Sequence, residues 1–485
     1  MFSNYSVVDE WVQPISKGLN VPIDQVKYFT NAIIAAPICF GLRYLPNNKN
    51  IKHIVYGTLG MIFSYLLFGQ ESITVIFTTI PVYLIMKYNK TQKAANICFI
   101  ITFGYLLYRH IYLYFNKYLI WTVEFTTTHM ILTLKLTGFA FSVANSNKKE
   151  LTKYLEIHKI NKYPNIIEYY GFIFFYPGLF SGPTLEYNDY MSFIDMSRFK
   201  EIKGNQLPKI PILKFIEHYF GGIILYFIYA YINSNPLPDP EYYILKHPET
   251  CNIGWKLLTI WWTVSTLRLK YYGTWKLTES LGEISGCGYT GTTKEGKDQF
   301  LLYRNVSILE FEICRSCKVN MDLWNTYVQK WLKNYVYVSM IGTPLEKYKT
   351  TLTMVVCAFW HGVYPGYYIS FLILGFDKDL SNLIYKRLDP FMKIKFGEKS
   401  IQWKLYDILL RVFNHWHLNY AVYPFMRFEL IPSLIVLYRT YFLGYLIPLF
   451  LYLWLSYYPP HLSYQNTMNE QLKQQKDSTL LKKED

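Results

Sequence analysis

Charged side chains are scarce in this chain. Asp, Glu, Lys and Arg make up 17% of its 485 residues, whereas apolar residues make up 51% and aromatic residues 19%. The few charges lie in short clusters between long apolar stretches. This scarcity excludes a string of ordinary soluble domains, which carry about 25% charged residues. The distribution is typical of a protein that crosses a membrane several times.

A cysteine framework is also missing. The seven cysteines are an odd number at irregular spacing, and the close pair Cys314 and Cys317 has no second pair or histidine pair nearby. Zinc sites and disulfide scaffolds need such partners. We therefore expect free thiols and no metal site.

The net charge of +15 does not indicate nucleic acid. Its basic residues lie at the ends of apolar runs, as in segments 87–93, 146–153 and 197–203. There they fix membrane topology or meet anionic lipid headgroups. No basic stripe with interleaved aromatics lies in a soluble segment, so we expect membrane lipids as partners and no nucleic acid.

Windows of about 20 apolar residues predict an all-α, polytopic membrane protein with about nine to eleven spans. The clearest windows are 28–46, 52–69, 71–86, 94–115, 119–143, 166–182, 212–233, 255–272, 351–373, 402–425 and 431–457. We expect one membrane-embedded domain over residues 1–461 and a polar cytosolic tail over 462–485. The tail ends in "KKED", and its Lys482 and Lys483 match a dilysine retrieval signal, which predicts the endoplasmic reticulum membrane.

One histidine stands out in the apolar stretch "CAFWHGVYPGYYISF". If 351–373 is a single helix, His361 lies about ten residues in, or about 15 Å along the axis, near the bilayer midplane. An imidazole there must face the protein interior or a water-filled cavity. Gly362 and Gly366 remove nearby side chains and Pro365 loosens the helix, which would let a substrate approach. The alternative is a core histidine hydrogen-bonded to a neighbouring helix.

Cys357 lies one turn before His361 on the same helical face. A Cys/His nucleophile pair is therefore one interpretation. The other is a small apolar packing residue, which is how cysteine commonly serves in such helices.

A second polar and aromatic segment is "MDLWNTYVQKWLKNYVYVSM", residues 321–340. Taken as one helix, it has an apolar face formed by Trp324, Val328, Trp331, Leu332 and Tyr335. An adjoining polar stripe consists of Asn325, Gln329 and Lys333. The segment is too polar for a lipid-exposed span, so it lines a cavity or lies at the interface, unless the stripe is simply solvated.

A third segment, "LRLKYYGTWKLTES" (267–280), places three cations beside three aromatic residues. The cations are Arg268, Lys270 and Lys276, and the aromatics are Tyr271, Tyr272 and Trp275. An interfacial aromatic belt with snorkelling cations explains the pattern. A binding site for an anionic, partly apolar ligand explains it as well.

Together these motifs resemble a known family. "WHGVYPGYY", "WNTYVQKWLKNYVY", "RLKYYGTWKLTE", "FYPGLFSGPTLEYNDY" and "TTTHMILTLKLTGFAF" resemble, in the same order, the motifs of membrane-bound O-acyltransferases of the lysophospholipid branch. The resemblance covers about residues 125–455. His129 departs from it, because a different polar residue is expected there, which leaves open the headgroup and the hydroxyl position that are favoured.

The resemblance implies helices around a catalytic chamber inside the bilayer, with short re-entrant or interfacial helices. It implies that His361 is the general base and that Asn325 orients the imidazole or hydrogen-bonds the acceptor or developing oxyanion. The donor would be acyl-CoA, a co-substrate rather than a bound cofactor, and the acceptor a lysophospholipid. The substrate-binding residues would be Lys270, Lys276, Tyr272, Trp275, Trp324, Trp331 and Tyr335.

Two other classes of function remain open at this point. A related acyltransferase could acylate a sterol, a diacylglycerol or a protein, although "GPTLEYNDY" and "RLKYYGTW" favour the lysophospholipid branch. A transporter would need paired intramembrane charges along a path. Here the predicted buried polar residues concentrate around one histidine instead.

Overall fold

The computed structural model describes residues 8–19, 21–120, 124–180, 182–183, 185–204, 206–234 and 239–457. This part of the chain is built from helices and one antiparallel hairpin of β1 (Gly291–Thr292) and β2 (Asp298–Gln299). The predicted all-α class is confirmed. The predicted polar tail, with Lys482 and Lys483, lies outside the described residues.

The chain divides into two compact units. Unit 1 comprises residues 1–237, 266–307 and 324–363, and unit 2 comprises residues 238–265, 308–323 and 364–485. Helix α11 (Ile253–Ser285) contributes its first part to unit 2 and its second part to unit 1. A single membrane-embedded domain ending at residue 461 stays a prediction.

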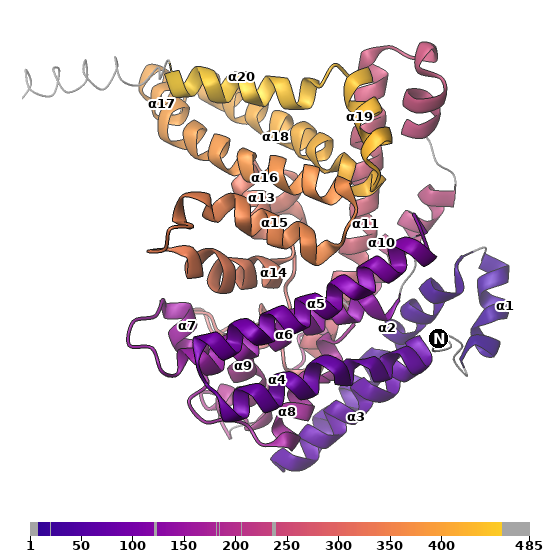
Figure 1. Cartoon of the computed structure of the whole chain (residues 1–485), viewed down its shortest axis with the longest axis vertical. Coiled ribbons are helices and arrows are strands. Elements are labelled where there is room, and N and C mark those ends of the chain that lie inside the picture. The colour runs from indigo at the N-terminus through magenta and orange to yellow at the C-terminus, as the bar shows by residue number, and fades with distance from the viewer. Residues whose placement is uncertain are drawn as a thin grey trace, which may run out of the picture. The chain divides into compact units, whose positions relative to one another are not determined.

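Unit 1 contains the N-terminal helices, drawn from indigo to magenta in Figure 1, and the segment that carries His361. Its helices besides α11 are α1 (Asp9–Leu19), α2 (Ile23–Gly41), α3 (Lys49–Phe68), α4 (Ile76–Tyr88), α5 (Gln92–Asn116), α6 (Phe125–Asn145), α7 (Lys153–His158), α8 (Ile166–Ile173), α9 (Tyr187–Ile194), α10 (Ile212–Ser234), α14 (Thr326–Trp331) and α15 (Lys349–His361). Helix α6 is buried along nearly its whole length, and α4, α5, α7, α8 and α14 pack against it.

Unit 2 contains the C-terminal helices, which are orange to yellow in Figure 1. Its helices besides α11 are α12 (Ile308–Glu312), α13 (Cys317–Leu323), α16 (Pro365–Leu383), α17 (Asp389–Phe396), α18 (Ile401–Arg427), α19 (Leu430–Arg439) and α20 (Leu443–Tyr457). Helix α16 packs against α13, α18 and α20.

Polar side chains fix where several helices begin. The Asn48 side chain accepts a hydrogen bond from the backbone of Ile51 at the start of α3. Asn165 and Glu168 form a capping box at the start of α8. Such caps satisfy backbone N–H groups that have no partner within the helix.

The predicted span 166–182 is wrong in extent, because α8 ends at Ile173 and a short 3-10 turn follows at Tyr176–Gly178. The buried Lys135 amine on α6 donates to the carbonyl oxygens of Phe172 (2.6 Å) and Ile173 (3.0 Å). A cation at the C-terminal end of a helix satisfies its free carbonyls and meets the negative end of its dipole. Lys135 thus caps the C-terminal end of α8 inside unit 1.

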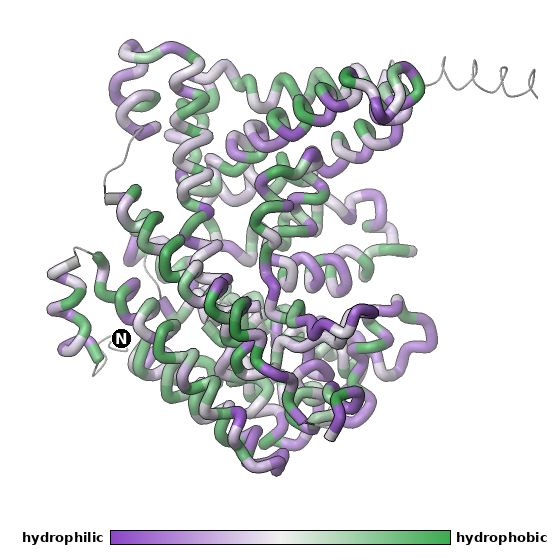
Figure 2. Tube along the Cα trace, turned by 180° about the vertical axis from the view of Figure 1, so that it is seen from behind, coloured by the Kyte–Doolittle hydropathy of each residue, from purple (hydrophilic) through white to green (hydrophobic). Residues whose placement is uncertain are grey.

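Three helical stretches of the described chain are long and apolar enough to cross a membrane: Lys49–Tyr88, Gln92–Asn116 and Ile212–Asn233. The pair Leu430–Arg439 and Leu443–Tyr457 passes the same test together but bends by 71° between its halves. Figure 2 shows apolar residues running along long helices. The chain is a multi-pass membrane protein, and the predicted window 431–457 is two helices rather than one.

Within the described residues, fewer helices are long and apolar enough to span a membrane than the predicted nine to eleven, and composition explains the difference. Helix α6 has 21 residues but carries Lys135 and His129, both buried inside unit 1. Helices that bury polar residues against other helices need not be apolar all round. The larger number of spans stays a prediction.

The predicted continuous helix 351–373 is wrong. Helix α15 ends at His361, Gly362 has φ 143°, and α16 begins at Pro365. Only glycine adopts such a backbone freely, and proline suits the first turn of a helix because its missing N–H would have no partner there. His361 is therefore the last residue of a helix. Its predicted depth at the bilayer midplane assumed one continuous helix, which the structure does not have.

Gly366 serves packing rather than access to His361. A Cβ atom at this position of α16 would overlap the carbonyl oxygen of Pro424 on α18. The Gly366 N–H also donates to the carbonyl of Phe428 at 2.9 Å. The missing side chain lets the two helix backbones of unit 2 approach closely.

Candidate active site

Trp360 fixes the end of α15, where His361 lies. Its carbonyl accepts a hydrogen bond from His110 Nε2 on α5 at 3.1 Å. Its indole N–H donates to the carbonyl of Met130 on α6 at 2.9 Å. The Trp360 and His361 rings meet edge to face, with centroids 4.7 Å apart. His361 is half-buried. The imidazole is thus held by a residue tied to two neighbouring helices while it remains partly accessible.

A buried ion pair lies beside these contacts. Arg109 precedes His110 on α5 and binds Glu71 at 2.8 Å, with side-chain exposures of 7% and 8%. The Arg109 Nε group also faces the Thr126 hydroxyl on α6 at 3.4 Å. This cluster is not among the predicted site residues, although "YRHIY" places two ionisable residues inside an apolar run, which is a functional signal in membrane helices.

Cys357 is 4% exposed and lies in the middle of α15. We predict that Cys357→Ala retains most acyl-transfer activity, because a small apolar packing residue is replaced by another. Single-turnover kinetics and intact-protein mass spectrometry check this. An acyl group accumulating on Cys357 would contradict it and would favour the Cys/His pair.

Asn325 lies outside any helix, so the prediction of one continuous helix over 321–340 is wrong. Helix α13 ends at Leu323, Asn325 has a left-handed backbone (φ 47°, ψ 56°), and α14 begins at Thr326. Asparagine is one of the few residues that tolerate this conformation. The Asn325 side chain makes no capping hydrogen bond to α14. Its amide is therefore not used to start the helix.

Backbone contacts hold the loop that carries Asn325. Trp324 pairs with Val306 in an isolated bridge, and the Thr326 N–H donates to the Asn305 carbonyl at 3.1 Å. The Asn305 N–H in turn donates to Glu279 Oε1 on α11 at 3.2 Å. These bonds on both sides of Asn325 fix its position relative to α11. Glu279 was not singled out from the sequence.

Phe103 on α5 connects the two segments that carry the predicted catalytic residues. Its ring lies 6.0 Å from Trp331 of α14 and 6.0 Å from Phe359 of α15, measured between centroids. The π-helical turn Leu332–Tyr337 that continues α14 also packs against α15. The Asn325 and His361 segments are therefore parts of one packed assembly in unit 1.

Four aromatic residues from the second and third sequence motifs lie together in the structure. Trp324 lies edge to face with Trp275 (4.8 Å), Tyr271 (5.8 Å) and Tyr272 (5.9 Å). Trp324 is adjacent to Asn325 in the chain. The "YYGTW" part of α11 and the Asn325 loop therefore form a single aromatic wall.

The predicted basic residues lie in different environments. Lys270 is 6% exposed, and its amine lies over the rings of Tyr229 (5.5 Å) and Tyr271 (5.3 Å). Lys276 binds Glu279 Oε2 at 3.0 Å, and Arg268 is buried. Lys276 thus supports the carboxylate that holds the Asn325 loop. Binding of a donor by these residues stays a prediction.

Trp331 and Tyr335 have protein partners. Trp331 is 0% exposed and donates to the Thr137 hydroxyl at 3.1 Å. The Tyr335 hydroxyl lies 2.9 Å from the Ser142 hydroxyl and donates to Glu186 Oε2 at 3.1 Å. Burial raises the pKa of Glu186, and nearby His158 and hydroxyl donors only partly offset that effect. These bonds hold α14 and its continuation on α6, and contact with substrate stays a prediction.

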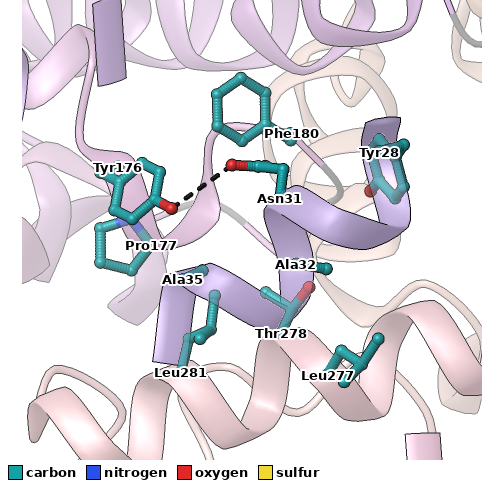
Figure 3. A pocket seen from close by; sticks show the side chains of 10 residues that line it. All are labelled: Tyr28, Asn31, Ala32, Ala35, Tyr176, Pro177, Phe180, Leu277, Thr278 and Leu281. Atoms are coloured by element: carbon teal, nitrogen blue, oxygen red, sulfur yellow. Dashed lines mark hydrogen bonds between the residues drawn. The ribbon is translucent and has the colours of Figure 1, made fainter. Parts of the chain in front are cut away.

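A small cavity of about 20 Å³ lies elsewhere in unit 1, lined mainly by residues of α2, of the turn after α8 and of α11. Figure 3 shows Asn31 and Tyr176 bonded across it, with Leu277 and Leu281 along one side. Its volume suits about one water molecule. Neither His361 nor Asn325 lines it, so this cavity is separate from the predicted catalytic residues.

Comparison with known proteins gives an independent result. The sequence pattern described as "MBOAT, membrane-bound O-acyltransferase family" matches residues 84–393. The "Lysophospholipid acyltransferase" of Schizosaccharomyces pombe is 26% identical over 90% of this chain and 87% of its own length. The human "Membrane-bound glycerophospholipid O-acyltransferase 2" is 26% identical over 87% and 83%, and the human "Membrane-bound glycerophospholipid O-acyltransferase 1" is 25% identical over 93% and 92%.

Proposed function

This chain belongs to the membrane-bound O-acyltransferase family, and we propose that it transfers a fatty acyl group from acyl-CoA to the free hydroxyl of a lysophospholipid. The main support is the similarity to lysophospholipid acyltransferases over most of both chains. The position of His361, held by Trp360 yet partly accessible, fits a base that must meet a substrate hydroxyl. We propose the endoplasmic reticulum membrane as its location, the compartment expected from the lysine pair Lys482 and Lys483.

The proposed reaction needs one proton carrier and one donor to the oxyanion. Neutral His361 takes the hydroxyl proton while the oxygen attacks the thioester carbonyl. The Asn325 amide donates to the developing oxyanion or to the His361 ring. The carbon–sulfur bond then breaks, and the proton passes to the leaving sulfur. The products are a diacyl phospholipid and free coenzyme A, so protons and electrons balance without a metal or a further cofactor.

The experiment that tests this function compares classes of acceptor. Purified full-length protein in lipid nanodiscs is given acyl-CoA and, in turn, lysophospholipids, a sterol, a diacylglycerol and no acceptor. We expect thiol release and a new diacyl phospholipid with the lysophospholipids. Transfer to the sterol or the diacylglycerol instead would identify another acceptor class, and no thiol release with any acceptor would contradict the proposal.

We predict that Lys270→Met raises the KM for acyl-CoA more than the KM for lysophospholipid. Coenzyme A carries several phosphate charges, and a lysine near the aromatic wall can attract them. The same asymmetry is predicted for Lys276→Met, with an added loss of turnover because Lys276 binds Glu279. Steady-state kinetics with each substrate varied in turn measure both constants.

The matched control is Lys214→Met, which removes an exposed lysine from α10 of the same unit. It should leave both KM values unchanged. If Lys270→Met raises the two KM values equally while the protein inserts correctly, Lys270 belongs to the scaffold or fixes topology instead.

A further inference from the structure

Buried polar atoms without hydrogen-bond partners gather at the start of α6. Among the described residues, four such atoms lie between positions 124 and 129: Glu124 Oε2, Thr128 Oγ1 and both ring nitrogens of His129. The His129 side chain is 0% exposed. Buried polar groups in proteins are nearly always hydrogen-bonded, so this concentration calls for an explanation. A polar ligand that enters this region would provide one.

His129 is linked to His361 by a short chain of contacts. His129 precedes Met130, whose carbonyl accepts the indole N–H of Trp360, and Trp360 precedes His361. The Trp360 carbonyl accepts from His110 on α5. His129 is therefore next in the chain to the residue whose carbonyl holds Trp360, which in turn precedes the proposed base.

The surroundings of His129 favour an uncharged ligand group. Its ring is packed between Tyr105 (4.7 Å, edge to face) and Phe125 (6.1 Å). The nearby guanidinium of Arg109 is already neutralised by Glu71. Tyr105 and Phe125 carry no charge and Arg109 is already paired, so these three residues offer a phosphate no unpaired cation. A neutral imidazole offers one donor and one acceptor, which suits a hydroxyl or an ester carbonyl.

Lysophospholipids carry three kinds of oxygen near the reacting centre: the free hydroxyl, the ester of the existing acyl chain, and the phosphate. His361 uses the hydroxyl, and the phosphate is disfavoured beside His129, because the ring lies between Tyr105 and Phe125 and the nearby cation, Arg109, already pairs with Glu71. We propose that His129 donates a hydrogen bond to the ester carbonyl of the acyl chain that the acceptor already carries. This inference rests on the proposed function and makes His129 a binding residue for the glycerol ester, independent of the headgroup.

The decisive comparison uses two acceptors that differ only in that carbonyl. One is a 1-acyl lysophospholipid, and the other is its 1-O-alkyl ether analogue with the same chain and headgroup. For the parent enzyme we expect the ether analogue to have a KM about tenfold higher, the factor for one neutral hydrogen bond. For His129→Phe, which keeps an aromatic ring between Tyr105 and Phe125, we expect the ester KM to rise about tenfold and the discrimination to disappear.

Two further variants separate binding from structure. His129→Gln restores an N–H donor, so it should recover part of the preference for the ester over the ether. His53→Gln replaces another buried histidine of unit 1, which binds the Tyr190 hydroxyl at 2.6 Å, and should leave the preference intact. If His129→Phe is unstable in detergent, His129→Gln in nanodiscs still tests the proposal. An N–H donor at position 129 changes the ratio of the ester and ether KM values only if it contacts the ester carbonyl.

Each outcome supports or overturns the proposal. Discrimination that survives in His129→Phe, or an equal rise in the KM for acyl-CoA, would overturn it and leave His129 a packing residue. An ester preference that changes with headgroup would likewise overturn the neutral-contact argument. A parent enzyme that acylates no lysophospholipid refutes the proposed function itself, whereas an active parent with an unaffected His129→Phe variant refutes this inference alone.

Discussion

His361→Ala should abolish acyl transfer while the protein remains folded. General-base catalysis contributes about 10²–10⁴-fold, and no other group has been assigned to take the hydroxyl proton. The structure adds a reason to expect normal folding, because Trp360 rather than the His361 ring makes the hydrogen bonds that tie α15 to α5 and α6. Turnover with saturating acyl-CoA and lysophospholipid measures the effect.

Thermal unfolding in detergent supplies the control for His361→Ala, and its midpoint should stay close to that of the parent. Trp360→Phe is the informative companion, since it keeps the peptide carbonyl but removes the N–H that binds Met130. We expect it to lower turnover less than His361→Ala does. Residual activity above a tenth in His361→Ala would remove His361 from the role of base.

The sequence was sufficient to single out His361 but not to place it. "WHGVYPGYY" drew attention to an imidazole in an apolar stretch, whereas hydropathy treated residues 351–373 as one continuous helix. The glycine after His361 and the proline at 365 were interpreted as features of access. They are the stop and start signals of two helices, with Gly362 at φ 143° and Pro365 in the first turn of α16. Local backbone signals outweighed hydropathy at this point.

The environment of the site depends on contacts between distant segments, which a single sequence does not contain. Glu71, in the 3-10 turn Gly69–Val75 that follows α3, pairs with Arg109 of α5, and Glu279 binds the Asn305 N–H across a turn and the hairpin. Neither Glu71 nor Glu279 belongs to a sequence motif that would indicate its partner. The left-handed backbone of Asn325 is similarly invisible, because it follows from the pairing of Trp324 and Thr326 with residues 305 and 306.

Asn325 calls for two substitutions rather than one, because its backbone and its amide both bear on activity. Its φ of 47° lies in the left-handed region, which costs an ordinary residue about 1–2 kcal/mol. Asn325→Ala therefore removes the amide and strains the loop, whereas Asn325→Gly removes the amide and keeps the loop relaxed. If the amide donates to the oxyanion, both variants should lose about 10²–10³-fold in kcat, as expected when one such donor is removed.

The pattern across the two Asn325 variants, measured as kcat and both KM values, identifies the role. Equal losses of kcat in Asn325→Gly and Asn325→Ala assign the effect to the side-chain amide. A near-normal Asn325→Gly with an impaired Asn325→Ala would assign it to the backbone turn that begins α14. Normal kcat in both, with a raised acceptor KM, would make Asn325 a binding residue, because an interaction made equally in the ground and transition states changes KM and leaves turnover alone.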